Sequence, residues 1–413
     1  MSRTLHAADL VLPIAAPPIP DGAVAVDGDR IVWVGPRRDW TGGGPVRTWP
    51  GLLAPGLVNA HCHLQYTAYA DMCEPGVDFL DWISVFAVRN GTMTDDDWRA
   101  STAAGVAELL RGGTTAVADV AARPVVVEAA AALAGISFVE AVGADGAGWP
   151  ARRPAFLERL AARAGRAVGV SPHTLYTLGS AVVRDCVAVA RERGLRLHPH
   201  LAESPYEVEY VATGTGPFAA ANLRWGLAME LAAAGGSART PAAELAELGA
   251  LGPDVHVAHG VHCDAADRAL LRAHGTTVAL CPRSNAMLGV GEAPVAAYRA
   301  EGSPVAVGTD SRASAPSLDL LADLAALRAT ALRQGSPEEG LDRWLVEAAT
   351  VGGARAMGID AGTLRPGARA DLAAFAVDPG PDPYAALTGA AGRCVGTVLA
   401  GRIVPDTAGT QVG

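Results

Sequence analysis

Apolar runs of four to seven residues recur through the middle of the chain and alternate with longer stretches rich in alanine and leucine. The runs have the length of buried strands, and the longer stretches have the length of helices. The predicted strands are Gly56–Ala60, Thr114–Val120, Ile136–Val142, Ala167–Val170, Leu195–Pro199, Val255–Ala258, Thr276–Leu280 and Val305–Gly308. The clearest predicted helices are Asp95–Arg111, Ser180–Arg193, Asp264–Ala273 and Ser317–Arg333. Eight strands that alternate with helices are parallel, and eight is the number that closes a (β/α)₈ barrel.

The two ends of the chain have a different pattern, in which short strands are separated by turns. The strands predicted there are Ala23–Val26, Arg30–Val34, Val46–Trp49, Ala370–Phe375 and Val395–Leu399. Within the middle part, residues 204–240 form a stretch longer than a usual connection. Long connections in compact domains are often functional, so we expect an extra helix or a lid there.

Composition narrows the function classes. The chain has 413 residues, half of them hydrophobic, which suits one large domain and a smaller one. Its formal charge is −10, so a nucleic-acid binder is not expected. The sequence contains no lysine, which excludes a Schiff-base lysine and a P-loop lysine. Six cysteines without a C-x-x-C pair predict reduced thiols in a cytoplasmic protein, and no apolar stretch predicts a membrane span.

Histidines stand where the first predicted barrel strand ends. Residues i and i+2 of a strand point to the same face, so His61 and His63 can reach one metal ion. Two imidazoles suit zinc or iron. The competing interpretation is a pair of hydrogen-bonded core histidines, because an H-x-H pattern also arises by chance. The active sites of (β/α)₈ barrels lie at the carboxyl ends of the strands, and these histidines have that position.

Polar residues end three further strands as well. His200 follows the fifth strand as a candidate metal ligand, and Glu203, three residues later, is a candidate proton carrier. His259 ends the sixth strand and Asp310 ends the eighth. Burying an unpaired carboxylate is costly, which favours a metal or histidine partner for Asp310. For single residues the alternatives are helix capping by Glu203 and an N-cap role for Asp310.

Two more histidines, His198 and His256, lie deeper in the fifth and sixth strands, and we expect them to be structural residues of the barrel interior. Independent core histidines have no reason to gather at strand ends. The combined pattern therefore predicts a metal-dependent hydrolase.

The same residues resemble the motifs of a known enzyme family. Residues 55–64 resemble the opening motif of the amidohydrolase superfamily. The segments that match its deaminase and chlorohydrolase branch, in order, are His200–Glu203, His259, Cys281–Asn285 and Gly308–Ser311. The resemblance implies a TIM-type (β/α)₈ barrel of residues 55–362. It also implies a small β-sandwich domain that both termini build, from residues 1–54 and 363–413.

The resemblance further implies one divalent metal ion, with zinc as the default and iron(II) or manganese fitting the same ligands. The implied ligands are His61, His63, His200 and Asp310. The missing lysine agrees with a single ion, because two-metal branches of the family commonly bridge their ions with a carbamylated lysine. In the implied reaction, Asp310 and His259 take protons from the attacking water, and Glu203 delivers a proton to a ring nitrogen and helps ammonia leave.

Three residues are candidates for binding the substrate. His173, at the mouth of the fourth strand, resembles a substrate-contacting histidine of adenosine-type members; the alternative is a turn histidine bonded locally. Arg283 and Asn285 flank the end of the seventh strand, in a motif that looks like the 6-aminodeoxyfutalosine deaminases of menaquinone synthesis. That substrate is an adenine nucleoside that carries a benzoate, and an arginine suits a carboxylate. We therefore expect Arg283 to be the carboxylate partner.

Other substrates and one other function class stay open. S-adenosylhomocysteine, methylthioadenosine, adenosine, guanine or a triazine would use the same chemistry, and a triazine-type chlorohydrolase would release chloride. A binding protein built on an inactive barrel is the alternative from a different class. The expected partner is a small molecule, with no nucleic acid and no membrane, and the resemblance implies a homodimer.

Overall fold

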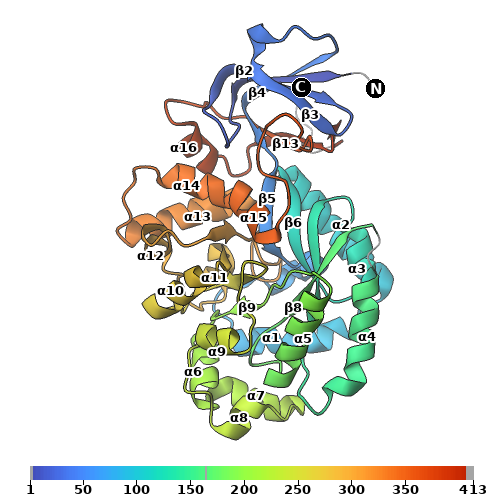
Figure 1. Ribbon diagram of the computed structural model, residues 1–413, viewed down its shortest axis with the longest axis vertical. Helices are drawn as coiled ribbons and strands as arrows, with labels where there is room; N and C mark the ends of the chain where they lie inside the picture. Colours follow the sequence, from blue (N-terminus) through green and yellow to red (C-terminus); the bar gives the residue numbers. More distant parts are fainter. Residues whose placement is uncertain (1–2, 163–164, 406–413) are drawn as a thin grey trace.

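The computed structural model describes residues 3–162 and 165–405. Its centre is a (β/α)₈ barrel, and the strands of the barrel form two parallel four-stranded sheets (Figure 1). The first sheet has the order β5 (Leu57–Cys62), β6 (Thr114–Ala121), β7 (Ala134–Ala141) and β8 (Ala167–Pro172). The second has the order β12 (Val305–Val307), β11 (Thr277–Leu280), β10 (His256–His259) and β9 (His200–Leu201). All eight predicted strand regions thus lie in the barrel.

Isolated β-bridges join the two sheets at two seams. At one seam Cys62 pairs with Asp310, and at the other Leu197 pairs with both Val170 and Val255. The fifth strand is the least regular of the eight, because β9 has only two residues and the segment before it contributes single bridges. Pro199 lies between these parts and has no N–H to donate to a ladder, which accounts for the break.

Helices surround the barrel. They are α1 (Phe79–Asn90), α2 (Asp95–Arg111), α3 (Pro124–Ala129), α4 (Trp149–Ala161), α5 (Ser180–Glu192), α6 (Pro205–Thr213), α7 (Gly216–Trp225), α8 (Glu230–Ala234), α9 (Pro241–Glu247), α10 (Ala265–Ala273), α11 (Pro282–Met287), α12 (Val295–Ala300), α13 (Leu320–Arg333), α14 (Leu341–Glu347), α15 (Gly353–Met357) and α16 (Pro383–Thr388). The prediction for α2 is confirmed to the residue. A capping box, in which Thr94 and Asp97 bond each other's main-chain N–H, fixes its start.

The long connection between β9 and β10 is helical. Three short helices, α6, α7 and α8, fill most of residues 204–240, where the sequence predicted one extra helix or a lid. They lie at the end of the molecule opposite the terminal sheet (Figure 1). Within the part of the chain that the structure describes, no helix is both long and apolar enough to cross a membrane.

Both ends of the chain build the smaller domain together, as predicted, and its strands form one seven-stranded sheet where the sequence predicted a β-sandwich. Its order is β15 (Arg402–Ile403), β14 (Cys394–Leu399), β13 (Leu372–Phe375), β4 (Val46–Pro55), β1 (Thr4–Val11), β2 (Ile19–Asp27) and β3 (Arg30–Pro36). The sequence did not single out β1, which is a central strand, parallel to β4 and antiparallel to β2. The chain passes from this sheet into the barrel at Gly56, between β4 and β5. The domain limits at residues 54/55 and 362/363 stay a prediction.

Candidate metal centre and active site

Strand β5 presents the first two histidines to the barrel interior. His61 and His63 point inward, while Cys62 between them packs outward against Val106 and Leu109 of α2. The strand is completely buried, so each alternate position must suit either the interior or the helix layer. His61 is fully buried and His63 nearly so. The predicted common face of the two histidines is therefore observed.

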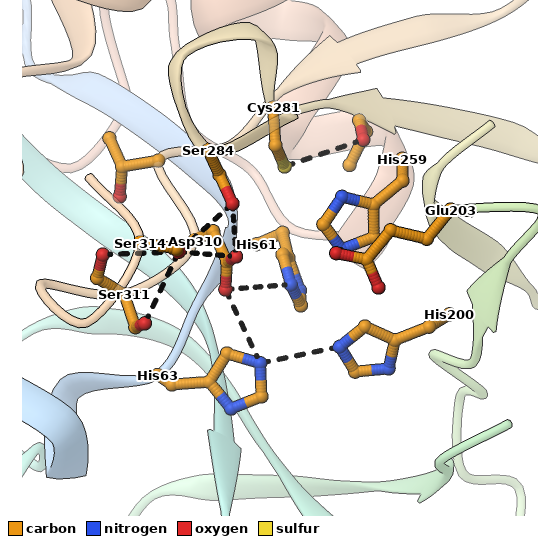
Figure 2. A network of polar contacts seen from close by, with 12 residues as sticks. His61, His63, His200, Glu203, His259, Cys281, Ser284, Asp310, Ser311 and Ser314 are labelled. Carbon is orange, nitrogen blue, oxygen red and sulfur yellow. Dashed lines mark hydrogen bonds and ion pairs between the residues drawn. The ribbon is translucent and has the colours of Figure 1, made fainter. Parts of the chain in front are cut away.

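The predicted metal ligands converge at the carboxyl ends of three strands (Figure 2). His63 Nε2 lies 3.3 Å from His200 Nε2, and Asp310 Oδ1 lies 3.6 Å from His63 Nε2. His61 Nε2 lies 3.5 Å from the same carboxylate oxygen and has no hydrogen-bond partner among the described residues. In a tetrahedral zinc site with bonds of about 2.0–2.1 Å, neighbouring ligand atoms are about 3.3 Å apart. These side chains fit one divalent metal ion.

A chain of hydrogen bonds fixes which nitrogen of His61 carries its proton. His256 Nε2 lies 3.1 Å from the main-chain oxygen of Ala60, and His198 Nδ1 lies 2.9 Å from the main-chain oxygen of His256. A carbonyl oxygen only accepts, so both nitrogens donate. His198 Nε2 must then accept, and it lies 2.8 Å from His61 Nδ1. His61 is therefore protonated at Nδ1 and presents a lone pair at Nε2.

This assignment requires that all three imidazoles are neutral. Burial lowers the pKa of His61, of His198 and of His256, the last to about 3. The sequence predicted His198 and His256 as structural residues of the barrel interior. The structure gives His198 a further part, because it is the acceptor that sets the tautomer of His61.

Two serines hold the carboxylate of Asp310. Ser284 Oγ donates to Asp310 Oδ2 at 2.6 Å, and Ser314 Oγ donates to the same oxygen at 2.8 Å (Figure 2). Oδ1 is thereby left to face His61 and His63. Burial by itself would raise the pKa of Asp310, but its position beside the imidazoles of His61, His63 and His259 lowers the pKa below its usual range. Asp310 is therefore an ionised, oriented carboxylate.

Glu203 and His259 form a second pair beside the metal ligands (Figure 2). Glu203 Oε1 lies 3.6 Å from His259 Nε2, and His259 Nδ1 donates to Asn285 Oδ1 at 3.0 Å. Burial, reinforced by the charge of Asp310, raises the pKa of Glu203 well above its usual range. Burial lowers the pKa of His259. The pair thus combines a carboxyl that can donate a proton with an imidazole Nε2 that can accept one.

The turns that present these groups have an unusual backbone. Ala202, His259 and Asp310 all have a positive φ, of 48°, 73° and 59°, and none is a glycine. Such conformations are strained and need support from the surroundings. Next to Ala202, the main-chain N–H of Glu203 donates to Glu207 Oε2 at 3.1 Å. Burial raises the pKa of the Glu207 carboxyl to about 8, although hydrogen bonds from the main-chain N–H groups of Ala202 and Glu203 lower it.

His173 lies at the mouth of the fourth strand, as predicted. Its ring centroid is 4.8 Å from that of His200, and Nδ1 lies 2.8 Å from Thr177 Oγ1. Nε2 has no hydrogen-bond partner among the described residues, and the side chain is partly exposed. The local hydrogen bond of the alternative interpretation is present, and it leaves Nε2 available to a ligand.

The structure gives Arg283 a different role from the one expected. Its guanidinium donates to Asp323 Oδ2 from Nε at 3.0 Å and from Nη2 at 2.7 Å, and Nη1 donates to Ser317 Oγ at 2.9 Å. Asp323 is fully buried, so Arg283 compensates a buried charge between α11 and α13. We no longer assign it to a substrate carboxylate. Asn285 Oδ1 accepts a hydrogen bond from His259, whereas its buried Nδ2 has no hydrogen-bond partner among the described residues, so its contact with a substrate stays a prediction.

Sequence reasoning missed the residues that orient the ligands. Ser284 lies inside the segment Cys281–Asn285 that carried the family resemblance, so a signal was present there. Ser314 lies four residues after Asp310 in an irregular turn, and no pattern marked it. The acceptor role of His198 depends on contacts between distant strands, which the sequence does not display.

A (β/α)₈ barrel with a histidine and carboxylate cluster at the carboxyl ends of its strands defines a metal-dependent hydrolase. The model of the amidohydrolase family matches residues 52–404 of the chain. The chain belongs to the amidohydrolase family. It is a hydrolytic enzyme that acts on carbon–nitrogen bonds, and a divalent metal ion is its cofactor.

Curated relatives share about a third of the sequence. The chain is 35% identical to the 5-methylthioadenosine/S-adenosylhomocysteine deaminase of Halobacterium salinarum, over 87% of this chain and 81% of that protein. It is 32% identical to the enzyme of the same name from Symbiobacterium thermophilum, over 98% of this chain and 94% of that protein.

Solved structures share the fold along nearly the whole chain. A zinc-bound adenosine deaminase from Xanthomonas campestris is 25% identical, with a TM-score of 0.80 over 97% of this chain and 92% of that one. The aminofutalosine deaminase of Helicobacter pylori has a TM-score of 0.85 over 97% of this chain and 100% of that one. At 20% identity, the second similarity shows the fold alone.

Proposed function

We propose that this chain is a hydrolytic deaminase that removes the 6-amino group of adenine nucleosides. The observation that carries the proposal is the buried carboxyl of Glu203, 3.6 Å from His259 and beside the candidate metal ligands, because deamination needs a proton donor for the ring and a base for the water. Burial raises the pKa of this carboxyl, which suits a proton donor. The names of the curated relatives make 5-methylthioadenosine and S-adenosylhomocysteine the first candidate substrates.

The proposed mechanism assigns a proton transfer to each of these groups. When bound, the metal ion lowers the pKa of a water molecule so that it can attack an sp² carbon near neutral pH. Asp310, ionised and held by its two serines, and His259, with a free Nε2, accept protons from the attacking water. Glu203 protonates the ring nitrogen next to the attacked carbon. Of the two protons taken from the water, one passes to the amino group as the carbon–nitrogen bond breaks, so that it leaves as ammonia, and the other returns to Glu203. His173 offers Nε2 to another ring nitrogen and so orients the base.

A second candidate substrate is 6-aminodeoxyfutalosine, which the segment Cys281–Asn285 favours by resemblance. Arg283 is paired with Asp323, so the structure adds no support for Arg283 as the partner of a substrate carboxylate. This substrate therefore ranks below the thioadenosine nucleosides.

Purified enzyme tests the proposal. Ammonia release and the loss of adenine absorbance are followed with adenosine, 5-methylthioadenosine, S-adenosylhomocysteine and 6-aminodeoxyfutalosine after loading with zinc, iron(II) or manganese. We expect turnover of at least one nucleoside, lost in Glu203→Gln with the metal content unchanged. Chloride release from a chlorotriazine without nucleoside turnover would identify a chlorohydrolase instead. The absence of both turnover and metal binding would indicate an inactive barrel.

Several finer assignments remain predictions from the sequence. They are zinc as the particular ion, direct metal ligation by His61, His63, His200 and Asp310, a homodimer, a cytoplasmic location and a link to menaquinone synthesis.

A further inference from the structure

The groups proposed to react leave one side of the barrel mouth free. They come from β5, β9, β10 and β12 and from the turns that follow these strands. A nucleoside whose base contacts Glu203, His259 and His173 can extend its sugar toward the ends of β7 and β8. The polar residues on that side therefore face the sugar of the substrate.

Strand β7 places a carboxyl group in this region. The ring of Phe138 lies 5.1 Å from that of His198 and 5.2 Å from that of His256, centroid to centroid. These histidines belong to strands that do not neighbour β7, so Phe138 points into the barrel. A Cβ at Gly169 on β8 would lie 2.5 Å from the Phe138 ring, so the glycine makes room for it. Two residues after Phe138, Glu140 points to the same interior face, one layer nearer the mouth.

Glu140 has an unsatisfied polar neighbour on the next strand. Glu140 pairs with Ser171, as Phe138 pairs with Gly169, and residues paired in this way present their side chains to the same face. Ser171 is fully buried, and its Oγ has no hydrogen-bond partner among the described residues. Buried polar groups normally have partners, so the unpaired Ser171 hydroxyl indicates a missing ligand.

Glu140 is only 5% exposed, and its carboxylate forms no hydrogen bond or ion pair within the described part of the chain. Arg159 is the cation that acts on its charge, but this guanidinium donates to the main-chain oxygens of Ala122 and Glu140. The negative charge of Glu140 also contributes to the raised pKa of Tyr66 and of Tyr176, after burial.

These two tyrosines lie beside residues of the candidate active site. The Tyr66 ring stacks on His63 at 5.6 Å, and the Tyr176 ring lies 6.0 Å from His173. The charge of Glu140 thus acts on two rings that lie beside a candidate metal ligand and beside the residue proposed to orient the base.

We propose that Glu140 and Ser171 form a subsite for the sugar hydroxyl groups of the substrate, with the Glu140 carboxylate accepting their hydrogen bonds. This inference rests on the proposed function, because it assumes a nucleoside. A carboxylate is the strongest hydrogen-bond acceptor among side chains, and ribose presents two adjacent donors. The serine beside it is uncharged, and Arg159 already offsets part of the negative charge, so hydroxyl donors fit this pair better than a cation.

Nucleosides that lack one hydroxyl test the subsite. The kcat/KM values for adenosine, 2′-deoxyadenosine and 3′-deoxyadenosine are measured with the wild type, Glu140→Gln and Ser171→Ala. The wild type is expected to prefer adenosine by about 10- to 100-fold over at least one deoxynucleoside, the range for a hydrogen bond to a charged group. Glu140→Gln is expected to lose most of this preference, mainly through KM, and Ser171→Ala a smaller part. Glu158→Gln, an exposed position on α4, is the matched control and is expected to retain it.

The outcomes separate the two proposals. Turnover of adenosine with the same preference in the wild type and Glu140→Gln would overturn the subsite and leave the proposed function intact. Loss of the preference in Glu158→Gln as well would also overturn it. No ammonia from any nucleoside would overturn the proposed function and the subsite together. Metal content and melting temperature are recorded for each variant. If Glu140→Gln does not fold, Ser171→Ala decides: an unchanged preference overturns the subsite, and a reduced one supports it.

Discussion

Replacing His198 by phenylalanine should weaken metal binding although His198 is not a ligand. The replacement keeps a flat ring of similar size but removes the nitrogen that accepts from His61 Nδ1 at 2.8 Å. His61 is completely buried, so its N–H would lose the acceptor that His198 provides, or the proton would move to Nε2 and block the candidate ligand atom. Either way the lone pair at Nε2 is no longer assured.

The size of the effect follows from this single contact. Leaving a buried donor unpaired costs about 1–3 kcal/mol, and loss of a partner that orients a metal-ligating histidine typically costs about 10- to 100-fold in affinity. These ranges agree, because each factor of ten corresponds to about 1.4 kcal/mol. We expect the dissociation constant for zinc to rise by about 10- to 100-fold in His198→Phe.

Chelator competition on the purified protein measures this constant without any substrate. Two variants serve as controls. His198→Gln retains a side-chain acceptor and should recover part of the affinity. His256→Gln should bind metal nearly as the wild type does, because His198 donates to the main-chain oxygen of His256 and not to its side chain. Equal zinc affinity in His198→Phe and the wild type would refute the tautomer argument, as would an equal loss in His198→Phe and His256→Gln.

Four further predictions follow from the site and its support. Glu203→Gln should lower kcat by about 10²- to 10⁴-fold with metal content intact, and a smaller loss would contradict proton transfer by Glu203. Arg283→Met should lower the free energy of unfolding by about 3–5 kcal/mol in urea, because fully buried Asp323 loses its partner; a KM effect limited to carboxylated nucleosides would instead restore the substrate role. Burial raises the pKa of Asp119 to about 7, so its contribution to stability is present below about pH 4 and is lost as the pH rises through about 7. Asp119→Asn should flatten this decline in urea unfolding between pH 5 and pH 8, and identical slopes would count against it. Removing the metal should lower the free energy of unfolding by about 2.7 kcal/mol relative to an ion concentration 100 times Kd, and so lower the melting temperature. Scanning calorimetry with and without chelator checks this.

The sequence predicted the barrel and its cluster of candidate metal ligands because both leave local patterns. Apolar runs mark buried parallel strands, and a histidine that directly follows such a run lies at the end of the barrel where active sites form. The predicted bounds of α2 match the structure to the residue, because Thr94 and Asp97 form a capping box that fixes the start of the helix. The fifth strand was predicted as Leu195–Pro199, but Pro199 interrupts the ladder and β9 follows it.

The substrate contacts could not be predicted in the same way. Arg283 has the charge of a carboxylate partner, and only the fold shows that Asp323, forty residues later, already neutralises it. Asn285 follows the seventh strand in the sequence, and its Oδ1 accepts a hydrogen bond from His259. Glu140 looks like an ordinary polar residue at a strand end until Phe138 shows which way that strand faces. Such roles depend on partners distant in the chain.

The two seams of the barrel give the metal ion a part in the cooperativity of folding. His61 and His63 belong to the sheet of β5–β8, whereas His200 belongs to the other sheet and Asp310 follows its edge strand. Isolated bridges at Cys62 and Leu197 join these sheets, where regular ladders would otherwise run. An ion bound by all four residues would link the two half-barrels, so that they would open together. Without it, amide hydrogens along the seams would exchange before those inside either sheet.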